Sequence, residues 1–374
     1  MKNVFRKAVA AVMAVATMAT ATAALTSCGK DKKDSFMIGA TGPLTGDNAS
    51  YGISVKNGAQ LAVEEINKKG GIQLTLNMLD DQAKPEEASS NYDTLYDDGM
   101  QISLGGVTSG AGEAFAKKAN VDKIFCMTPS GSSDKVIDNM DYSFRLCFGD
   151  PDQGKIAANN IASNASYVKV GALYDTSDSY SSGIYEAFKA EMAVLNKTYT
   201  ETVFDNESKV DFSTQAEALK DCDVIFMPFY YNEAQLFMKK AVEKGYDGVF
   251  FGCDGFDGIA EYIGGITNKV MYITPFDANS EEANVKAFVE AYKAKYNAVP
   301  DQFAADAYDV VMVLAAALEK AGVTDYNLSA EEVSTAVKNM VTSSDFTYTG
   351  LTGNNMKWTA DGKCTKEPKI VEFN

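Results

Sequence analysis

The chain has 374 residues, of which 46% are hydrophobic and 23% are charged, so it is long enough for two domains with sizeable cores and too apolar for a disordered protein. Its formal net charge of −17 argues against nucleic acid binding, because an acidic surface repels phosphates. The sequence contains no histidine, which excludes Ser-His-Asp and Cys-His catalysis and the zinc sites that need histidine.

Other signatures of enzymes and of metal sites are also missing. The sequence has no G-x-S-x-G, no S-x-x-K followed by its partner motifs, no Walker A and no G-x-G-x-x-G opening a helix. Five cysteines follow Cys28 without a C-x-x-C pair, an odd number that indicates neither a disulfide framework nor a zinc site. Of these, Cys126, Cys222 and Cys253 lie in or beside apolar segments and are expected to be buried thiols. We therefore expect no enzymatic activity, no metal and no cofactor.

The N-terminus has the layout of a secretory signal. Three basic residues within positions 1–7 precede an apolar run over 8–24, which is short for a membrane-spanning helix. Leu25-Thr26-Ser27-Cys28-Gly29 resembles the bacterial lipoprotein signal, which is cleaved before a cysteine that is then lipidated. A plain signal peptide with a chance cysteine is the alternative. We expect residues 1–27 to be the signal peptide and residues 28–35 a polar tether, and removal of the signal lowers the formal net charge to −20.

From Phe36 onward, strand, turn and helix segments alternate at about 30 residues per unit, the length of a βα repeat that feeds a parallel sheet. Phe36–Ala40 and Leu74–Met78 are expected strands. A helix capped by Ser50 is expected to run to about Asn67. Pro85 is expected to start a second helix, which ends near Gly99.

Two stretches predict neighbouring turns that could bind a small anion. In Leu104–Phe115 an apolar strand breaks into a small-residue turn, with Ser109 as the expected N-cap of the helix that follows. Ile124–Ser133 repeats this arrangement. The first N–H groups of a helix have no partner within it and lie at the positive end of its dipole, so a carboxylate or phosphate can bind there. At the carboxyl ends of parallel strands, both turns should face one crevice.

A second set of units follows the strand expected over 141–148. Asp150–Gln153 is expected to cap its first helix. Its expected strands are 168–174, 223–228, 249–252 and 271–276. Helices over 281–296 and 303–321 then return to the first set, and the second of these is apolar on most faces, as expected of a buried helix. Ser329 and Glu332 form the expected capping box of a last helix.

Several motifs, in order, resemble the branched-chain amino-acid-binding family, the type I periplasmic binding proteins of ABC importers. They are Gly42-Pro43-Leu44-Thr45-Gly46, Tyr51-Gly52, Asn57–Asn67, Gly70-Gly71-Ile72 and Asp80-Asp81-Gln82. The resemblance implies an α/β fold with two lobes, each a mostly parallel sheet with helices on both faces, joined by three crossings near 148–150, 276–277 and 349–350. Residues 36–149 and 277–349 would form lobe 1. Residues 150–276 and 350–374 would form lobe 2.

The resemblance also assigns ligand-binding residues one by one. Ser109 corresponds to the family serine that meets the ligand carboxylate, and Ser130, Gly131 and Ser132 to a turn that contacts carboxylate and ammonium. Asp254 falls where the family places an acid against the ammonium. Aromatic residues match positions that line the cleft: Tyr51, Tyr180, either Tyr230 or Tyr231, and Phe256, which replaces a position that is often Trp. Each can also be read as ordinary core, rim or helix cap.

The function that this resemblance implies is capture of an amino-acid-like solute outside the membrane and its delivery to an ABC permease. We expect a monomer, lipid-anchored on the extracytoplasmic side of a bacterial membrane, whose lobes close on the ligand by hinge motion. The alternative is an extracellular sensing domain that acts through a signalling partner. The side chain of the ligand stays open.

Overall fold

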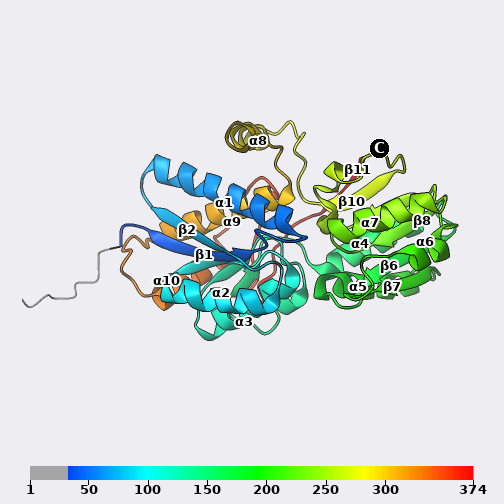
Figure 1. The fold of residues 1–374 in the computed structure, drawn as a ribbon. Helices are drawn as coiled ribbons and strands as arrows, with labels where there is room; N and C mark the ends of the chain where they lie inside the picture. Colours follow the sequence, from blue (N-terminus) through cyan, green and yellow to red (C-terminus); the bar gives the residue numbers. More distant parts are fainter. Residues whose placement is uncertain (1–32, 374) are drawn as a thin grey trace, which may run out of the picture. The chain divides into compact units, whose positions relative to one another are not determined.

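The computed structural model describes residues 33–373, which hold two sheets and their helices (Figure 1). The predicted signal peptide, with Cys28, lies outside the described residues. Within them, no helix has the length and apolar character needed to cross a membrane. The architecture is that of a two-sheet α/β protein, as predicted.

The first sheet is parallel throughout and has the strand order β2-β1-β3-β4-β5. Its strands are β1 (Phe36–Gly42), β2 (Leu74–Asp80), β3 (Ile102–Gly105), β4 (Cys126–Thr128) and β5 (Ser143–Arg145). In register, Ile38 lies opposite Leu76 on one side and Ile102 on the other. β3 and β4 are buried along their whole length, as expected of a parallel sheet covered by helices.

Six α-helices of the described residues come from the two segments assigned to the first sheet, 36–149 and 277–349. They are α1 (Ala49–Lys69), α2 (Pro85–Asp97), α3 (Ser109–Val121), α8 (Ala283–Tyr296), α9 (Gln302–Lys320) and α10 (Ala330–Val341), with a short 3-10 helix η1 (Asp134–Val136). α9 is buried on most faces, as its sequence predicted. Gly58 of α1 lets the two helices approach closely, because a Cβ there would lie 2.0 Å from the carbonyl oxygen of Ala304 in α9. The Ser329–Glu332 capping box is also confirmed.

The second sheet has the order β11-β10-β9-β8-β6-β7, with only β11 antiparallel to its neighbour. Its strands are β6 (Val170–Asp175), β7 (Thr200–Phe204), β8 (Val224–Met227), β9 (Val249–Gly252), β10 (Val270–Thr274) and β11 (Lys369–Phe373). Its helices are α4 (Asp150–Ser163), α5 (Ser179–Val194), α6 (Ser213–Leu219) and α7 (Tyr231–Glu243), with the 3-10 helices η2 (Asp254–Phe256) and η3 (Ile259–Glu261).

Two predicted helix caps are wrong. α1 begins at Ala49 with Asn48 as its N-cap, so Ser50 lies inside the helix. Thr108 is the N-cap residue of α3, and the hydroxyl of Ser109, the first helical residue, instead accepts a bond from the Ser133 N–H at 3.2 Å. The stretch Asp150–Gln153 does cap α4, as predicted, through Asp152, whose Oδ2 accepts the N–H of the N-cap residue Gly149 at 3.1 Å.

The lobe boundaries remain predictions. Hydrogen bonds of residues 358–362 concern the third predicted crossing, near 349–350. Trp358 donates its indole N–H to the Arg145 carbonyl, and the Arg145 N–H donates to the Gly362 carbonyl. These bonds attach residues 358–362 to β5 of the first sheet, whereas Lys369–Phe373 pairs with β10 of the second. We infer that the last crossing lies nearer 365–368 than 349–350.

Candidate functional site

The two hydroxyl-rich turns of the first sheet lie side by side, as predicted. Besides the bond between Ser133 and Ser109, the Ser130 hydroxyl donates to the Val107 carbonyl at 2.8 Å and the Thr128 hydroxyl donates to the Gly106 carbonyl at 2.7 Å. The loops after β3 and β4 are therefore fixed to one another before any ligand binds. The beginning of α3 lies at this shared edge, with its unpaired N–H groups.

A small cavity of about 10 Å³ joins these turns to the second sheet, and it has room for roughly one water molecule. Six of the predicted site residues line it, and four further residues complete it. The predicted ones are Tyr51, Ser109, Ser130, Tyr180, Tyr230 and Asp254. The additional ones are Val107, Thr108, Gly255 and Phe303.

Asp254 is the acidic group of this cavity. It follows β9 as the first residue of η2 and is only 4% exposed. The Tyr180 hydroxyl donates to Asp254 Oδ1 at 2.6 Å and accepts the Gly255 N–H at 2.9 Å. Burial raises the pKa of Asp254 to about 6, and the bond from Tyr180 limits the rise because it stabilises the carboxylate.

Aromatic rings form the walls. Tyr180 and Tyr230 stack with ring centroids 4.8 Å apart, and Tyr51 packs on Phe303 at 4.3 Å. The Tyr51 hydroxyl donates to the Gly255 carbonyl and accepts the Tyr231 N–H at 3.0 Å. Tyr51 belongs to α1 beside the first sheet, whereas Gly255 and Tyr231 follow strands of the second, so this one hydroxyl joins elements of both.

Of the tyrosine pair, Tyr230 lines the cavity and Tyr231 does not. Tyr231 begins α7, donates its hydroxyl to the Asp47 carbonyl at 2.7 Å, and packs its ring on Tyr262. Gly131 and Ser132 do not line the cavity. Phe256 is fully buried, and its ring lies over Gly252, where a Cβ would be 2.1 Å from the ring. This packing places it in the core instead of the cleft.

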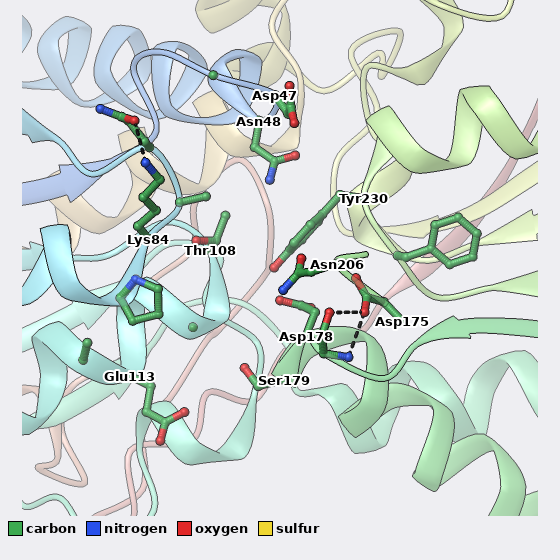
Figure 2. A pocket seen from close by; sticks show the side chains of 18 of the residues that line it. Asp47, Asn48, Lys84, Thr108, Glu113, Asp175, Asp178, Ser179, Asn206 and Tyr230 are labelled. Carbon is green, nitrogen blue, oxygen red and sulfur yellow. Dashed lines mark hydrogen bonds between the residues drawn. The ribbon is translucent and has the colours of Figure 1, made fainter. Parts of the chain in front are cut away.

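The cavity adjoins an open crevice of about 760 Å³. Thr108 and Tyr230 line both spaces. Figure 2 shows Tyr230 pointing across the crevice toward Thr108, with Asp175, Asp178 and Asn206 on the same side as Tyr230 and Lys84 and Glu113 opposite. Six carboxylates and three lysines line the crevice, so its walls carry an excess of negative charge.

Several buried polar atoms around these two spaces have no hydrogen-bond partner among the described residues. They include Thr108 Oγ1, Tyr230 OH and Glu233 Oε2, and all three residues line the crevice. Buried polar groups in folded proteins are nearly always paired, so such a cluster marks a place that a polar ligand or water completes.

Residues 33–373 contain no group of three or more acidic, cysteine or histidine residues arranged to hold a metal ion. The five cysteines in this range are free thiols, and Cys126, Cys222 and Cys253 are buried, as predicted.

A sequence profile of the periplasmic binding protein family matches residues 35–374. The Leu/Ile/Val-binding protein homolog 3 of Brucella melitensis is 30% identical over 298 residues, which cover 77% of this chain and 80% of that protein. A leucine-, isoleucine-, valine-, threonine- and alanine-binding protein of Pseudomonas aeruginosa is 30% identical over 308 residues, which cover 80% of this chain and 82% of that protein.

Solved structures agree with the sequence relatives. The branched-chain amino acid transporter substrate-binding protein of Streptococcus pneumoniae, in complex with isoleucine, is 29% identical, has a TM-score of 0.80, and matches 90% of this chain and 95% of its own. A leucine-binding protein of Thermotoga maritima is 26% identical with the same TM-score, over 90% of this chain and 94% of its own. The chain therefore belongs to the periplasmic binding protein family, among the type I substrate-binding proteins of branched-chain amino-acid ABC importers.

Proposed function

We propose that this protein captures a small amino acid or amide, as branched-chain amino-acid-binding relatives do, outside the cytoplasm and between the part of the chain that carries the first sheet and the part that carries the second. The observation that carries the proposal is the composition of one cavity. Ser109, Ser130 and the beginning of α3 lie on its first-sheet side, whereas Asp254 and Tyr180 lie on its second-sheet side. This pairing suits a zwitterion, because the helix terminus favours its carboxylate and the buried acid favours its ammonium.

The size of the cavity supports a binding mechanism that includes movement. A space of about 10 Å³ is too small for any amino acid, so the surrounding loops must separate before the solute enters and close again around it. The bond between Tyr51 and Gly255 joins the two sides at this point. Hinge closure of this kind would sequester the solute from water.

We further propose that Cys28 carries the lipid anchor, that the protein acts as a monomer, and that it delivers its solute to an ABC permease in the same membrane. Each of these rests on the sequence motifs and on the family, and each can fail without affecting solute binding.

Isothermal titration calorimetry of the purified protein with leucine, isoleucine, valine, threonine and alanine tests the central proposal. Saturable binding of at least one of them, with a smaller radius of gyration in small-angle scattering at saturation, is the expected result. Failure of every amino acid, including a wider panel of the common twenty, would reject amino-acid capture. Binding without compaction would reject only the closing motion.

A further inference from the structure

The end of the cavity that would receive a ligand side chain is polar. If the carboxylate and ammonium lie at Ser109, Ser130 and Asp254, the side chain must extend toward the crevice through the gap between Thr108 and Tyr230, the two residues that line both spaces. Thr108 is 5% exposed, and neither its hydroxyl nor that of Tyr230 has a hydrogen-bond partner among the described residues.

A third residue with an unpaired oxygen lines the same crevice. Glu233, 6% exposed, lines the crevice in the first turn of α7. Its Oε1 lies 3.6 Å from Lys209 Nζ, whereas its Oε2 has no partner in the described part of the chain. The helix dipole stabilises a carboxylate in the first turn of a helix. This accounts for an acid at position 233 but not for the unpaired hydroxyls of Thr108 and Tyr230.

An aliphatic side chain would leave all three groups unpaired in the closed protein. A buried polar group without a hydrogen-bond partner raises the free energy of the state that contains it. The bound state avoids this penalty when the ligand supplies the partner. A side chain that ends in a hydrogen-bond donor would supply one, and the excess of carboxylates along the crevice favours a neutral or positive group over a negative one.

Resting on the proposed amino-acid capture, we propose that the preferred solute carries a hydrogen-bond donor at the end of its side chain, a hydroxyl, amide or ammonium group, which Thr108, Tyr230 and Glu233 accept. The side-chain subsite of this protein is then polar, unlike one that selects leucine, isoleucine or valine by apolar contact alone. Acidic side chains are excluded by the same carboxylates.

Calorimetry with near-isosteric pairs tests this inference: threonine against valine, asparagine against leucine, and lysine against norleucine, with aspartate as the acidic member. We expect the donor-bearing member of at least one pair to bind about fivefold or more tighter, the effect of one added hydrogen bond, and aspartate to bind more weakly than asparagine. The pair that shows the preference distinguishes a hydroxyl, an amide and an ammonium.

Three variants connect that preference to the named side chains. Thr108→Val and Tyr230→Phe each remove one unpaired hydroxyl with little change in shape, and each should reduce the preference severalfold while leaving the aliphatic member as tight or tighter. The control is Ser177→Ala, because the Ser177 hydroxyl lines the same crevice but already donates to Asp175 at 2.6 Å. It should leave the preference unchanged, and thermal melts of all three proteins check folding.

The outcomes separate the two proposals. Equal or tighter binding of the aliphatic member in every pair, or a preference that survives both Thr108→Val and Tyr230→Phe, would overturn the polar subsite while amino-acid capture stands. Binding of no member of any pair would overturn amino-acid capture and this inference together.

Discussion

The Tyr51 hydroxyl donates to the carbonyl oxygen of Gly255, and the two residues lie 204 positions apart in the sequence. The hydroxyl oxygen of Tyr51 also accepts the Tyr231 N–H, so three segments meet at one phenol group that is almost completely buried. Since α1 lies beside the first sheet and η2 follows a strand of the second, this contact should form fully only when the two halves are close.

Tyr51→Phe should therefore weaken solute binding. The substitution keeps the ring and its packing on Phe303, but leaves the buried Tyr231 N–H and Gly255 carbonyl without their partner, at about 1–3 kcal/mol. We expect about five- to hundredfold weaker binding of the best amino acid in calorimetry. Tyr96→Phe is the control, because Tyr96 is 44% exposed. Unchanged affinity in Tyr51→Phe would mean that the contact does not depend on closure.

A buried ion pair connects residue 366, close to the last crossing, to helix α9. Lys366 pairs with Asp306 of α9, and their side chains are 0% and 3% exposed. Lys366→Met leaves the carboxylate buried without its partner and should lower the unfolding free energy by about 3–5 kcal/mol. The double variant Lys366→Met with Asp306→Leu should recover most of that loss in denaturant titrations. A single variant as stable as the wild type would show that water or another group compensates Asp306.

Much of the fold follows from the sequence because the chain repeats one unit. Each buried strand ends in a turn with small or hydroxyl residues and is followed by an amphipathic helix. This alternation predicted most of the strands in both sheets and most of the helices that pack on them. β7 and α6 were not anticipated. β7 is an edge strand in which only Phe204 is buried, and its sequence, Thr200–Phe204, therefore lacks the apolar pattern of the other strands.

The site was predictable where a local motif carries it and not where only packing decides. Ser109 lies in the small-residue turn after β3, so the local sequence could place it at this edge of the sheet, whereas Asp254 was assigned from the resemblance to the family. Phe303 comes from α9, far along the chain from Tyr51, and nothing local signals its contact. Tyr230 and Tyr231 could not be told apart, because the start of α7 between them decides which ring faces the cavity.

Stability should increase when the ligand-free protein is moved from pH 7 to pH 5. Burial raises the pKa of Asp81, Asp254 and Asp309 from 3.8 to about 6. Each group therefore binds its proton more tightly in the folded than in the unfolded chain, so its contribution is present at low pH and is lost as the pH rises through about 6. We expect roughly 1 kcal/mol from each group over this window, measured by urea titrations at both pH values.

Solute affinity should have the opposite pH dependence, because protonated Asp254 cannot compensate an ammonium. Binding should weaken as the pH falls below about 6. Asp81→Asn separates the two effects, since the carboxylate of Asp81 accepts from the Thr41 hydroxyl and the Ala83 N–H and lines neither the cavity nor the crevice. It should reduce the pH dependence of stability and leave that of binding unchanged. Affinity that stays constant from pH 7 to pH 5 would remove Asp254 from the ammonium site.

The lipid anchor has its own test in cells. Cys28→Ser should give a precursor that is either uncleaved or released in soluble form, because lipidation and the cleavage that depends on it both require the thiol. Membrane fractionation and metabolic labelling with a fatty acid measure this. Normal cleavage with unchanged membrane retention would reject the lipoprotein assignment and favour a plain signal peptide.

Asp254→Ala and Ser109→Ala should differ in how strongly they weaken the binding of an amino acid. Removing Asp254 leaves the ligand ammonium buried and uncompensated, at about 3–5 kcal/mol, so affinity should fall by roughly a hundredfold to a few thousandfold. Ser109→Ala removes one hydrogen bond to a charged group, about 1.5–3 kcal/mol, and should weaken binding less.

Calorimetry with the best solute at pH 7.5 compares the two variants, and thermal melts check that both fold. If Asp254→Ala binds as tightly as the wild type, the solute has no ammonium at this position, and capture of a different small carboxylate becomes the function to test.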